Sequence, residues 1–322
     1  MRFVPLDTPK PISKIGLGTW QFGSREWGYG PEYERRAAQI VRRALDLGVT
    51  LYDTAEVYGF GRSERILGAA LGDDRSKVVL ASKILPVLPV APVVEQRAVA
   101  SAARLGVGSI DLYQVHQPNP VVRDRSTMRG MRLLQDVGLV GEVGVSNYGL
   151  ARWRAAETAL GRRVLSNQVR YSIVDRAAER DLLPYAERAG RLVIAYSPLA
   201  QGFVSGRYDA KNPPSGAIRR ANPYFLPENL ARGAGLLDTL REVAAAHDAT
   251  PSQIALAYLL RHPNVVAIPG ASTVEQMERN AAAADLDLTD DEYAALVAAA
   301  TAFQPVTGLA AVPKLIRARS GR

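Results

Sequence analysis

The chain has 322 residues, of which 47% are hydrophobic and 22% charged, a composition typical of a globular protein with a large core. It contains no cysteine and only three histidines, none spaced as metal ligands, which excludes disulfides and thiol nucleophiles and argues against a metal site. The net charge is +8, but residues 303–322 hold four basic and no acidic residues, so the rest is nearly balanced and nucleic-acid binding is not expected.

No part of the sequence indicates membrane insertion. A run of about 18 apolar residues is absent, and the first ten residues lack the apolar core of a signal peptide. We therefore expect a cytoplasmic protein that does not interact with membranes.

Short apolar and β-branched runs alternate with amphipathic segments along the chain. The runs predict eight strands, at 15–19, 50–53, 78–83, 111–116, 142–146, 166–170, 192–196 and 265–268. The amphipathic segments predict helices at 36–47, 63–71, 93–105, 127–137, 150–160, 178–189 and 274–284, and a further helix from Pro251 to Arg261 with Thr250 as its N-cap. Strand ends recur roughly every 30 residues, the size of a βα unit.

This order of elements predicts an α/β protein, a (β/α)8 TIM barrel. A doubly wound sheet is the alternative, and it is less favoured because no dinucleotide-binding fingerprint follows the first strand. We expect one barrel domain over 1–302 and a solvated basic C-terminal tail over 303–322. The segment 201–235 is rich in proline and glycine, which predicts a long irregular loop with a function.

Polar residues stand at the carboxyl ends of three successive strands. Asp53, Lys83 and His116 end the second, third and fourth strands, and Tyr58 follows Asp53 by five residues. In a barrel these ends form one face, so the four side chains are expected to meet in a proton-transfer site. There Asp53 would pair with Lys83, Lys83 would lower the pKa of Tyr58 toward neutral, and His116 would hydrogen bond a substrate oxygen. Each residue alone is more often structural; together they indicate function.

Several segments share the order and the residues of a known family. They are TLYDTAEVYG (50–59), ASK (81–83), DLYQVH (111–116), GVSN (144–147), NQ (167–168), YSPL (196–199) and IPG (268–270). Over about residues 12–300 the chain resembles the aldo-keto reductases of bacterial type. The resemblance implies a (β/α)8 barrel that reduces aldehydes or ketones to alcohols with NADPH or NADH.

The resemblance also implies a role for each matching residue. Tyr58 would be the general acid, tuned by Asp53 and Lys83, while His116 would orient the carbonyl. The amide of a nicotinamide cofactor would be held by Ser146, Asn147 and Gln168, and its ring would stack on Tyr196. Its pyrophosphate would be held by Ser197, Leu199, Gln201 and Gly202. The segment 201–235 would cover it, with Arg219 and Arg220 as candidate phosphate contacts.

The residues expected to contact the adenine end of the cofactor depart from the family pattern. Gly270 and Gln276 stand where many members have lysine and arginine, and Arg279 precedes Asn280 where glutamate is common. Arg279, with Ser272 and Gln276, would bind a 2′-phosphate. We expect NADPH as the cofactor, with NADH as the alternative.

The substrate is expected to be a small carbonyl compound with apolar or aromatic character. The pocket walls predicted for it are Trp20, Tyr58 and His116, with Phe22, Trp27, Tyr52 and the C-terminal tail. A monomer or weak homo-oligomer without metal is expected. The alternative function is a cofactor-bound sensor or binding subunit of the same fold with little turnover.

Overall fold

The computed structural model describes residues 1–24, 30–209, 212–214 and 216–319. Eight parallel strands follow one another in chain order across a single sheet. They are β1 (Leu17–Gly18), β2 (Leu51–Asp53), β3 (Val79–Ile84), β4 (Ile110–Val115), β5 (Val140–Ser146), β6 (Ser166–Arg170), β7 (Leu192–Tyr196) and β8 (Val265–Ala267). The predicted strands are confirmed to within two residues at each end.

The sheet closes on itself. Parallel bridges join Ile15 to Ala267 and Gly18 to Gly270, so the first and last strands are neighbours. The backbone N–H of Gly16 donates to the carbonyl of Ala267 at 2.8 Å. This closure confirms the (β/α)8 barrel.

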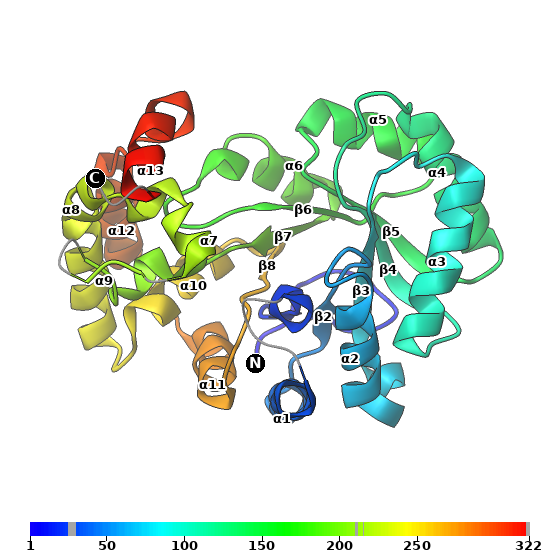
Figure 1. Cartoon of the computed structure of the whole chain (residues 1–322), viewed down its shortest axis with the longest axis horizontal. Coiled ribbons are helices and arrows are strands. Elements are labelled where there is room, and N and C mark those ends of the chain that lie inside the picture. Colours follow the sequence, from blue (N-terminus) through cyan, green and yellow to red (C-terminus); the bar gives the residue numbers. More distant parts are fainter. Residues whose placement is uncertain (25–29, 210–211, 215, 320–322) are drawn as a thin grey trace.

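Helices follow the strands and surround the barrel (Figure 1). They are α1 (Pro31–Asp46), α2 (Arg62–Leu71), α3 (Ala91–Leu105), α4 (Asp124–Asp136), α5 (Leu150–Leu160), α6 (Leu182–Ala189), α10 (Pro251–Leu260) and α11 (Val274–Ala282). Helix α1 begins earlier than predicted, at Pro31, because proline is well suited to the first helical position. Thr250 caps α10 as predicted, in a capping box with Gln253.

The segment 201–235 is only partly irregular, which corrects the prediction of a loop. It contains η5 (Ala200–Ser205), α7 (Ala217–Arg220), η6 (Pro223–Phe225) and α8 (Pro227–Arg232), and α9 (Ala234–Ala246) begins at its end. Pro223 and Pro227 stand at the starts of short helices, a position that proline favours. Helix α12 (Asp290–Ala302) was also not predicted.

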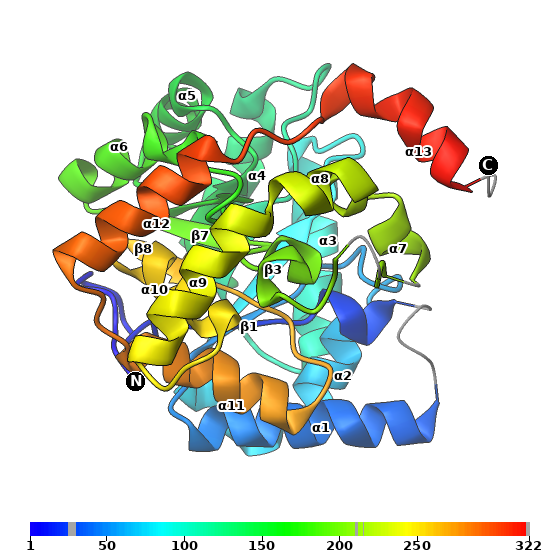
Figure 2. The ribbon, with the colours of Figure 1, turned by 90° about the vertical axis from the view of Figure 1, so that its left-hand side faces the viewer.

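The C-terminal segment packs on this same region. It contains η8 (Gly308–Ala311) and α13 (Val312–Arg319), which lies beside α7 and α8 (Figure 2). The Asn229 side chain donates to the Val306 carbonyl at 2.9 Å and accepts from its N–H at 2.8 Å. Lys314 forms an ion pair with Glu228 at 2.6 Å.

The apolar core has two parts. One lies between the barrel and its helices. The other fills the interior of the barrel, below the carboxyl ends of the strands, with inward side chains that include Leu51, Val79, Leu112, Ile194 and Val266. Because strand side chains alternate, the polar residues that follow on this inner face gather at the carboxyl ends. No helix of the described residues is long and apolar enough to cross a membrane.

Candidate active site

A cavity of about 680 Å³ opens at the carboxyl ends of the strands. Its wall contains every residue predicted to contact a cofactor except Arg220, together with Trp20, Asp53, Tyr58 and His116. The cofactor set comprises Ser146, Asn147, Gln168, Tyr196, Ser197, Leu199, Gln201, Gly202, Gly270, Ser272, Gln276, Arg279 and Asn280. The structure therefore brings together residues that are far apart in the sequence, such as Trp20 and Asn280, which are 260 positions apart.

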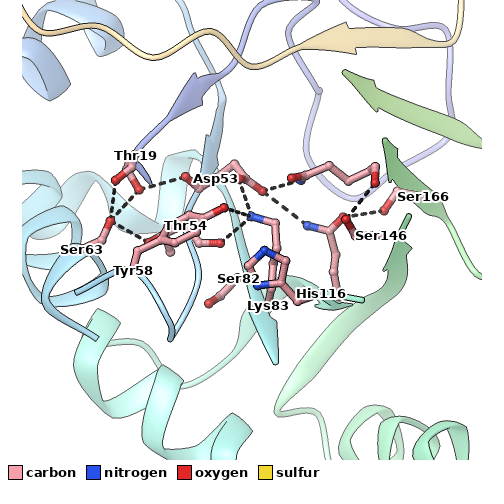
Figure 3. A network of polar contacts seen from close by, with 12 residues as sticks. Thr19, Asp53, Thr54, Tyr58, Ser63, Ser82, Lys83, His116, Ser146 and Ser166 are labelled. Carbon is pink, nitrogen blue, oxygen red and sulfur yellow. Dashed lines mark hydrogen bonds and ion pairs between the residues drawn. The ribbon is translucent and has the colours of Figure 1, made fainter. Parts of the chain in front are cut away.

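Lys83 lies beneath the cavity wall, fully buried, and connects two predicted catalytic residues. Its Nζ donates to Oδ1 of Asp53 at 2.5 Å and to Oη of Tyr58 at 3.4 Å (Figure 3). A third bond, to the carbonyl of Thr54 at 2.8 Å, uses its remaining proton. The predicted pair of Asp53 and Lys83 is confirmed, and the ammonium is fixed against the phenol.

The electrostatics differ from the prediction in one respect. Burial raises the pKa of the Tyr58 phenol, and the charge of Lys83 lowers it by less, so the net shift is upward, not toward neutral. Burial alone would lower the pKa of Lys83, but the charge of Asp53, together with the hydrogen bonds to Asp53 and Tyr58, outweighs burial and raises that pKa. Both groups therefore hold their protons at neutral pH, as a proton donor and its supporting cation would.

His116 extends β4 toward the cavity, and its ring lies next to that of Tyr58. Burial, with a contribution from Lys83, lowers the pKa of the imidazole to about 3, so the ring is neutral. Its Nδ1 is buried and has no hydrogen-bond partner among the described residues. A neutral imidazole is a hydrogen-bonding group here, not a second charge.

Hydroxyl groups fix the chain around Asp53. Ser63, at the start of α2, donates to the carbonyl of Thr19 at 2.8 Å and accepts from the Thr54 hydroxyl at 2.9 Å. Thr19 in turn donates to the carbonyl of Asp53 at 2.9 Å. These buried bonds join the ends of β1 and β2, and so hold the segment that carries Tyr58.

Ser146, Asn147 and Tyr196 form a connected polar group on the opposite wall. Tyr196 donates to Oδ1 of Asn147 at 2.9 Å, and Nδ2 of Asn147 donates to Oγ of Ser146 at 3.0 Å. Asn147 has a left-handed backbone with φ of 61°, which is uncommon outside glycine and is found at functional sites. Gln168 also lines the cavity, and its Nε2 donates to Oδ2 of Asp53 at 2.8 Å.

The turn after β7 has an unusual backbone. Ser197, Ala200 and Gln201 all have left-handed φ angles, between 48° and 58°. Such conformations cost energy and persist where the surrounding structure requires them. Two of these residues, Ser197 and Gln201, are in the predicted pyrophosphate turn.

Positive charge predominates in the cavity wall. Its charged side chains are Asp53, Arg207, Arg219 and Arg279, and Asp53 is already neutralised by Lys83. Arg207 was missed by sequence reasoning, although it lies within the predicted covering segment. Arg220 is exposed and lies outside the wall, whereas Arg219 lines it and donates to the carbonyl of Gln201 at 3.0 Å. The wall is suited to an anionic ligand.

The predicted adenine end is partly occupied by bonds within the protein. Gln21 donates to the carbonyl of Ala271 at 2.7 Å, and a Cβ at Gly270 would lie 2.6 Å from its amide oxygen. Oε1 of Gln276 accepts from the N–H of Ser272 at 2.7 Å. In contrast, Arg279 forms no hydrogen bond or ion pair with any residue that the structure describes.

Part of the predicted substrate pocket is wrong. Phe22 and Tyr52 are buried elsewhere and do not line the cavity, and no described residue after 303 does so. Tyr52 points away from the barrel interior because its neighbour Asp53 points inward. Trp27 lies outside the described residues, whereas Trp20 lines the cavity with 43% of its surface exposed.

Comparisons with known proteins agree with this geometry. A model described as the aldo/keto reductase family matches residues 14–301. An uncharacterized oxidoreductase of Mycobacterium tuberculosis is 55% identical over 323 residues and covers 100% of both chains. A methylglyoxal reductase of Escherichia coli is 32% identical over 288 residues, covering 88% of this chain and 90% of the other. A crystal structure of an aldo/keto reductase from Klebsiella pneumoniae, in complex with NADP and acetate, is similar with a TM-score of 0.74 and 30% identity, covering 91% of this chain and 93% of that one.

Proposed function

The chain belongs to the aldo/keto reductase family of oxidoreductases, and we propose that it reduces small aldehydes or ketones to alcohols with a nicotinamide cofactor. The observation that supports this most is the contact of Lys83 with both Asp53 and Tyr58 below a cavity with a positive wall. A buried phenol with a cation at its oxygen is a proton donor whose conjugate base is stabilised.

The cavity fits such a cofactor in size and chemistry. It can hold a ligand much larger than a small carbonyl compound, and it offers arginines to phosphates and a polar group at Asn147 to an amide. When bound, the reduced nicotinamide supplies the hydride that adds to the carbonyl carbon. We assign its phosphates to the turn after β7 and to Arg207 and Arg219.

Tyr58 then protonates the carbonyl oxygen. The substrate oxygen, on which negative charge develops, accepts the proton from Oη of Tyr58. The ammonium of Lys83 stabilises the phenolate that forms. Asp53 keeps Lys83 charged and in place. His116, being neutral, orients the carbonyl by a hydrogen bond without adding a charge.

We propose NADPH as the preferred cofactor and Arg279 as the residue that selects it. Arg279 lines the cavity and makes no hydrogen bond or ion pair among the described residues, although its charge is felt by Glu275, so its guanidinium is available to a 2′-phosphate. Ser272 would support that contact. The side chain of Gln276 contributes less than predicted, because its oxygen is used by the Ser272 N–H.

The substrate is proposed to be a reactive small carbonyl compound, which the relative named as a methylglyoxal reductase supports. The test is the loss of NADPH absorbance with methylglyoxal and with 4-nitrobenzaldehyde. Tyr58→Phe should lower turnover about 10²- to 10⁴-fold and leave the cofactor Kd unchanged.

Tyr185→Phe is the matched control, because this hydroxyl bonds Glu157 on the outside of the barrel. A loss under tenfold in folded Tyr58→Phe protein would refute the proton-donor role. Cofactor binding without turnover in the wild type would favour the sensor or binding subunit.

A further inference from the structure

One row of residues crosses four neighbouring strands beside the Asp53 carboxylate. In the register of the sheet, Lys83 on β3 pairs with Gln114 on β4, Gln114 with Gly144 on β5, and Gly144 with Ser166 on β6. Three of these residues have side chains that reach inward, and the glycine between them has none. A gap therefore lies between Gln114 and Ser166.

The side chain of Gln114 spans this gap. Oγ of Ser166 donates to Oε1 of Gln114 at 3.2 Å, and Nε2 of Gln114 donates to Oδ2 of Asp53 at 3.4 Å. A Cβ at Gly144 would lie 2.3 Å from Oγ of Ser166 and 2.8 Å from Cγ of Gln114. The bridge can form only because residue 144 is glycine.

Neither Gln114 nor Ser166 touches the cavity. Gln114 and Ser166 are both 0% exposed, and neither lines the wall. Just below them, the barrel is filled with apolar side chains such as Leu112 and Ile194. Burying an amide and a hydroxyl in such an interior is costly unless their bonds are satisfied, and here the bonds lead to Asp53.

We propose that Gln114, held by Ser166 across the gap at Gly144, is a positioning residue for the reaction and acts through Asp53. This inference rests on the proposed function. Oδ2 of Asp53 accepts from Gln114 and Gln168, while Oδ1 accepts from Lys83. Hydrogen-bond donors at Oδ2 stabilise the Asp53 carboxylate, so its hydrogen bond from Lys83 is weaker. The Lys83 ammonium can then interact more strongly with Oη of Tyr58.

Other titratable groups face the same centre. Lys83 comes from β3, Tyr58 from the segment after β2, His116 from β4 and Tyr196 from β7. Lys83, Asp53 and Tyr196 act on the pKa of Tyr58, and Lys83 acts on that of His116, so a pH profile belongs to the group and not to one residue. The informative quantity is therefore the difference between variants measured in the same buffers.

Gln114→Leu removes the bridge and keeps the volume similar. We expect kcat to fall about fivefold to tenfold, because a donor to a charged group is lost. Without it, Asp53 holds Lys83 more tightly and the phenol becomes less acidic, so the alkaline limb of kcat should move upward by about half a pH unit. KM should not change, because Gln114 does not touch the cavity.

Gln114→Glu tests the donor directly. Protonated glutamic acid can donate to Asp53, whereas ionised glutamate repels it. The pH profile of kcat should therefore show a new limb in a range where the wild-type profile is flat. Ser166→Ala should change kcat in the same direction as Gln114→Leu but by less. The double variant should be no worse than Gln114→Leu alone, because both residues act through one bridge.

Asn264→Ala is the control for simple destabilisation. This buried amide donates to carbonyls of Ala186 and Arg191, at the opposite end of the barrel. It should lower Tm without moving the pH profile. The proposal is overturned if Gln114→Leu lowers kcat only in proportion to Tm, with its alkaline limb unchanged.

A readout without turnover separates this inference from the proposed function. The ¹⁵N side-chain amide signals of Gln114 can be assigned by their loss in Gln114→Leu. They should shift in Asp53→Asn and exchange faster in Ser166→Ala, and unshifted signals in both would overturn the bridge. An inactive wild type with the expected amide shifts would refute the reductase function and leave the contact standing.

Discussion

The imidazole ring of His116 stands edge-on to the phenol ring of Tyr58, with 5.7 Å between the ring centroids and 81° between the planes. Both rings belong to residues of the cavity wall. A substrate carbonyl oxygen placed between them can face the hydroxyl of Tyr58 and the edge of the His116 ring. This arrangement requires a neutral imidazole, since a cation beside Lys83 would be repelled.

The neutral state of His116 predicts the acid side of the pH profile. Its pKa of about 3 lies well below 6.5, so no limb from this residue should appear in kcat/KM between pH 5 and 8. Profiles of the wild type and His116→Gln should therefore run parallel in that range. A wild-type limb near pH 6.5 that disappears in His116→Gln would contradict the assignment.

The same shift predicts how stability depends on pH. Because the folded-state pKa of His116 is lower than the unfolded one, the unfolded chain binds the proton more readily below pH 6.5. The free energy of unfolding should therefore decrease progressively as the pH falls from 6.5 toward 3. Urea unfolding at pH 7.5 and 5 should show a smaller loss in His116→Gln than in the wild type.

Lys83→Met should damage both activity and stability. It leaves the Asp53 carboxylate buried without its cation, which is expected to cost about 3–5 kcal/mol in the free energy of unfolding. The double variant Lys83→Met with Asp53→Asn should regain much of that stability but no turnover. If the double variant regained activity, Lys83 would be structural and not part of the proton-transfer group.

Cofactor preference should depend on Arg279. We expect NADPH to bind at least about tenfold more tightly than NADH, since a charge-assisted contact to a phosphate contributes about 1.5–3 kcal/mol. Arg279→Ala should remove most of that difference in Kd, measured by fluorescence titration, and higher salt should reduce it. Arg220→Ala is the matched control, being an arginine outside the cavity wall. Equal affinities in the wild type would refute the role.

The C-terminal segment should be released by Asn229→Ala. Asn229 is fully buried and makes two hydrogen bonds to the backbone of Val306. Limited proteolysis should therefore cut the variant after Phe303 much faster than the wild type. Thr239→Ala, which removes an exposed hydrogen bond on α9, should not change the pattern. Equal cutting rates for both variants would show that other contacts hold the segment.

The strand ends were predictable because two independent signals agree at Asp53, Lys83 and His116. Each is polar after an apolar run, and each matches a family segment. Buried parallel strands also have few alternative registers, since a shift by one residue would turn Asp53 outward. The roles assigned to these residues stay predictions.

The errors arose where tertiary contacts decide the outcome. Tyr52 was placed in the pocket although strand alternation excludes it once Asp53 faces inward. Gln114 was read only as part of a motif, because its partner Ser166 is 52 residues away and the gap at Gly144 is visible only in the register. The small helices of 201–235 are stabilised by packing and not by their own propensity.

The seam between β1 and β8 has a consequence for the order in which the molecule is made. Residue 15 leaves the ribosome long before its partner Ala267, and closing a loop of that length costs entropy that local contacts do not repay. Until then, the first strands present an open edge to other nascent chains. Ribosome-bound chains arrested before residue 265 should therefore be far more sensitive to protease than chains arrested well beyond it.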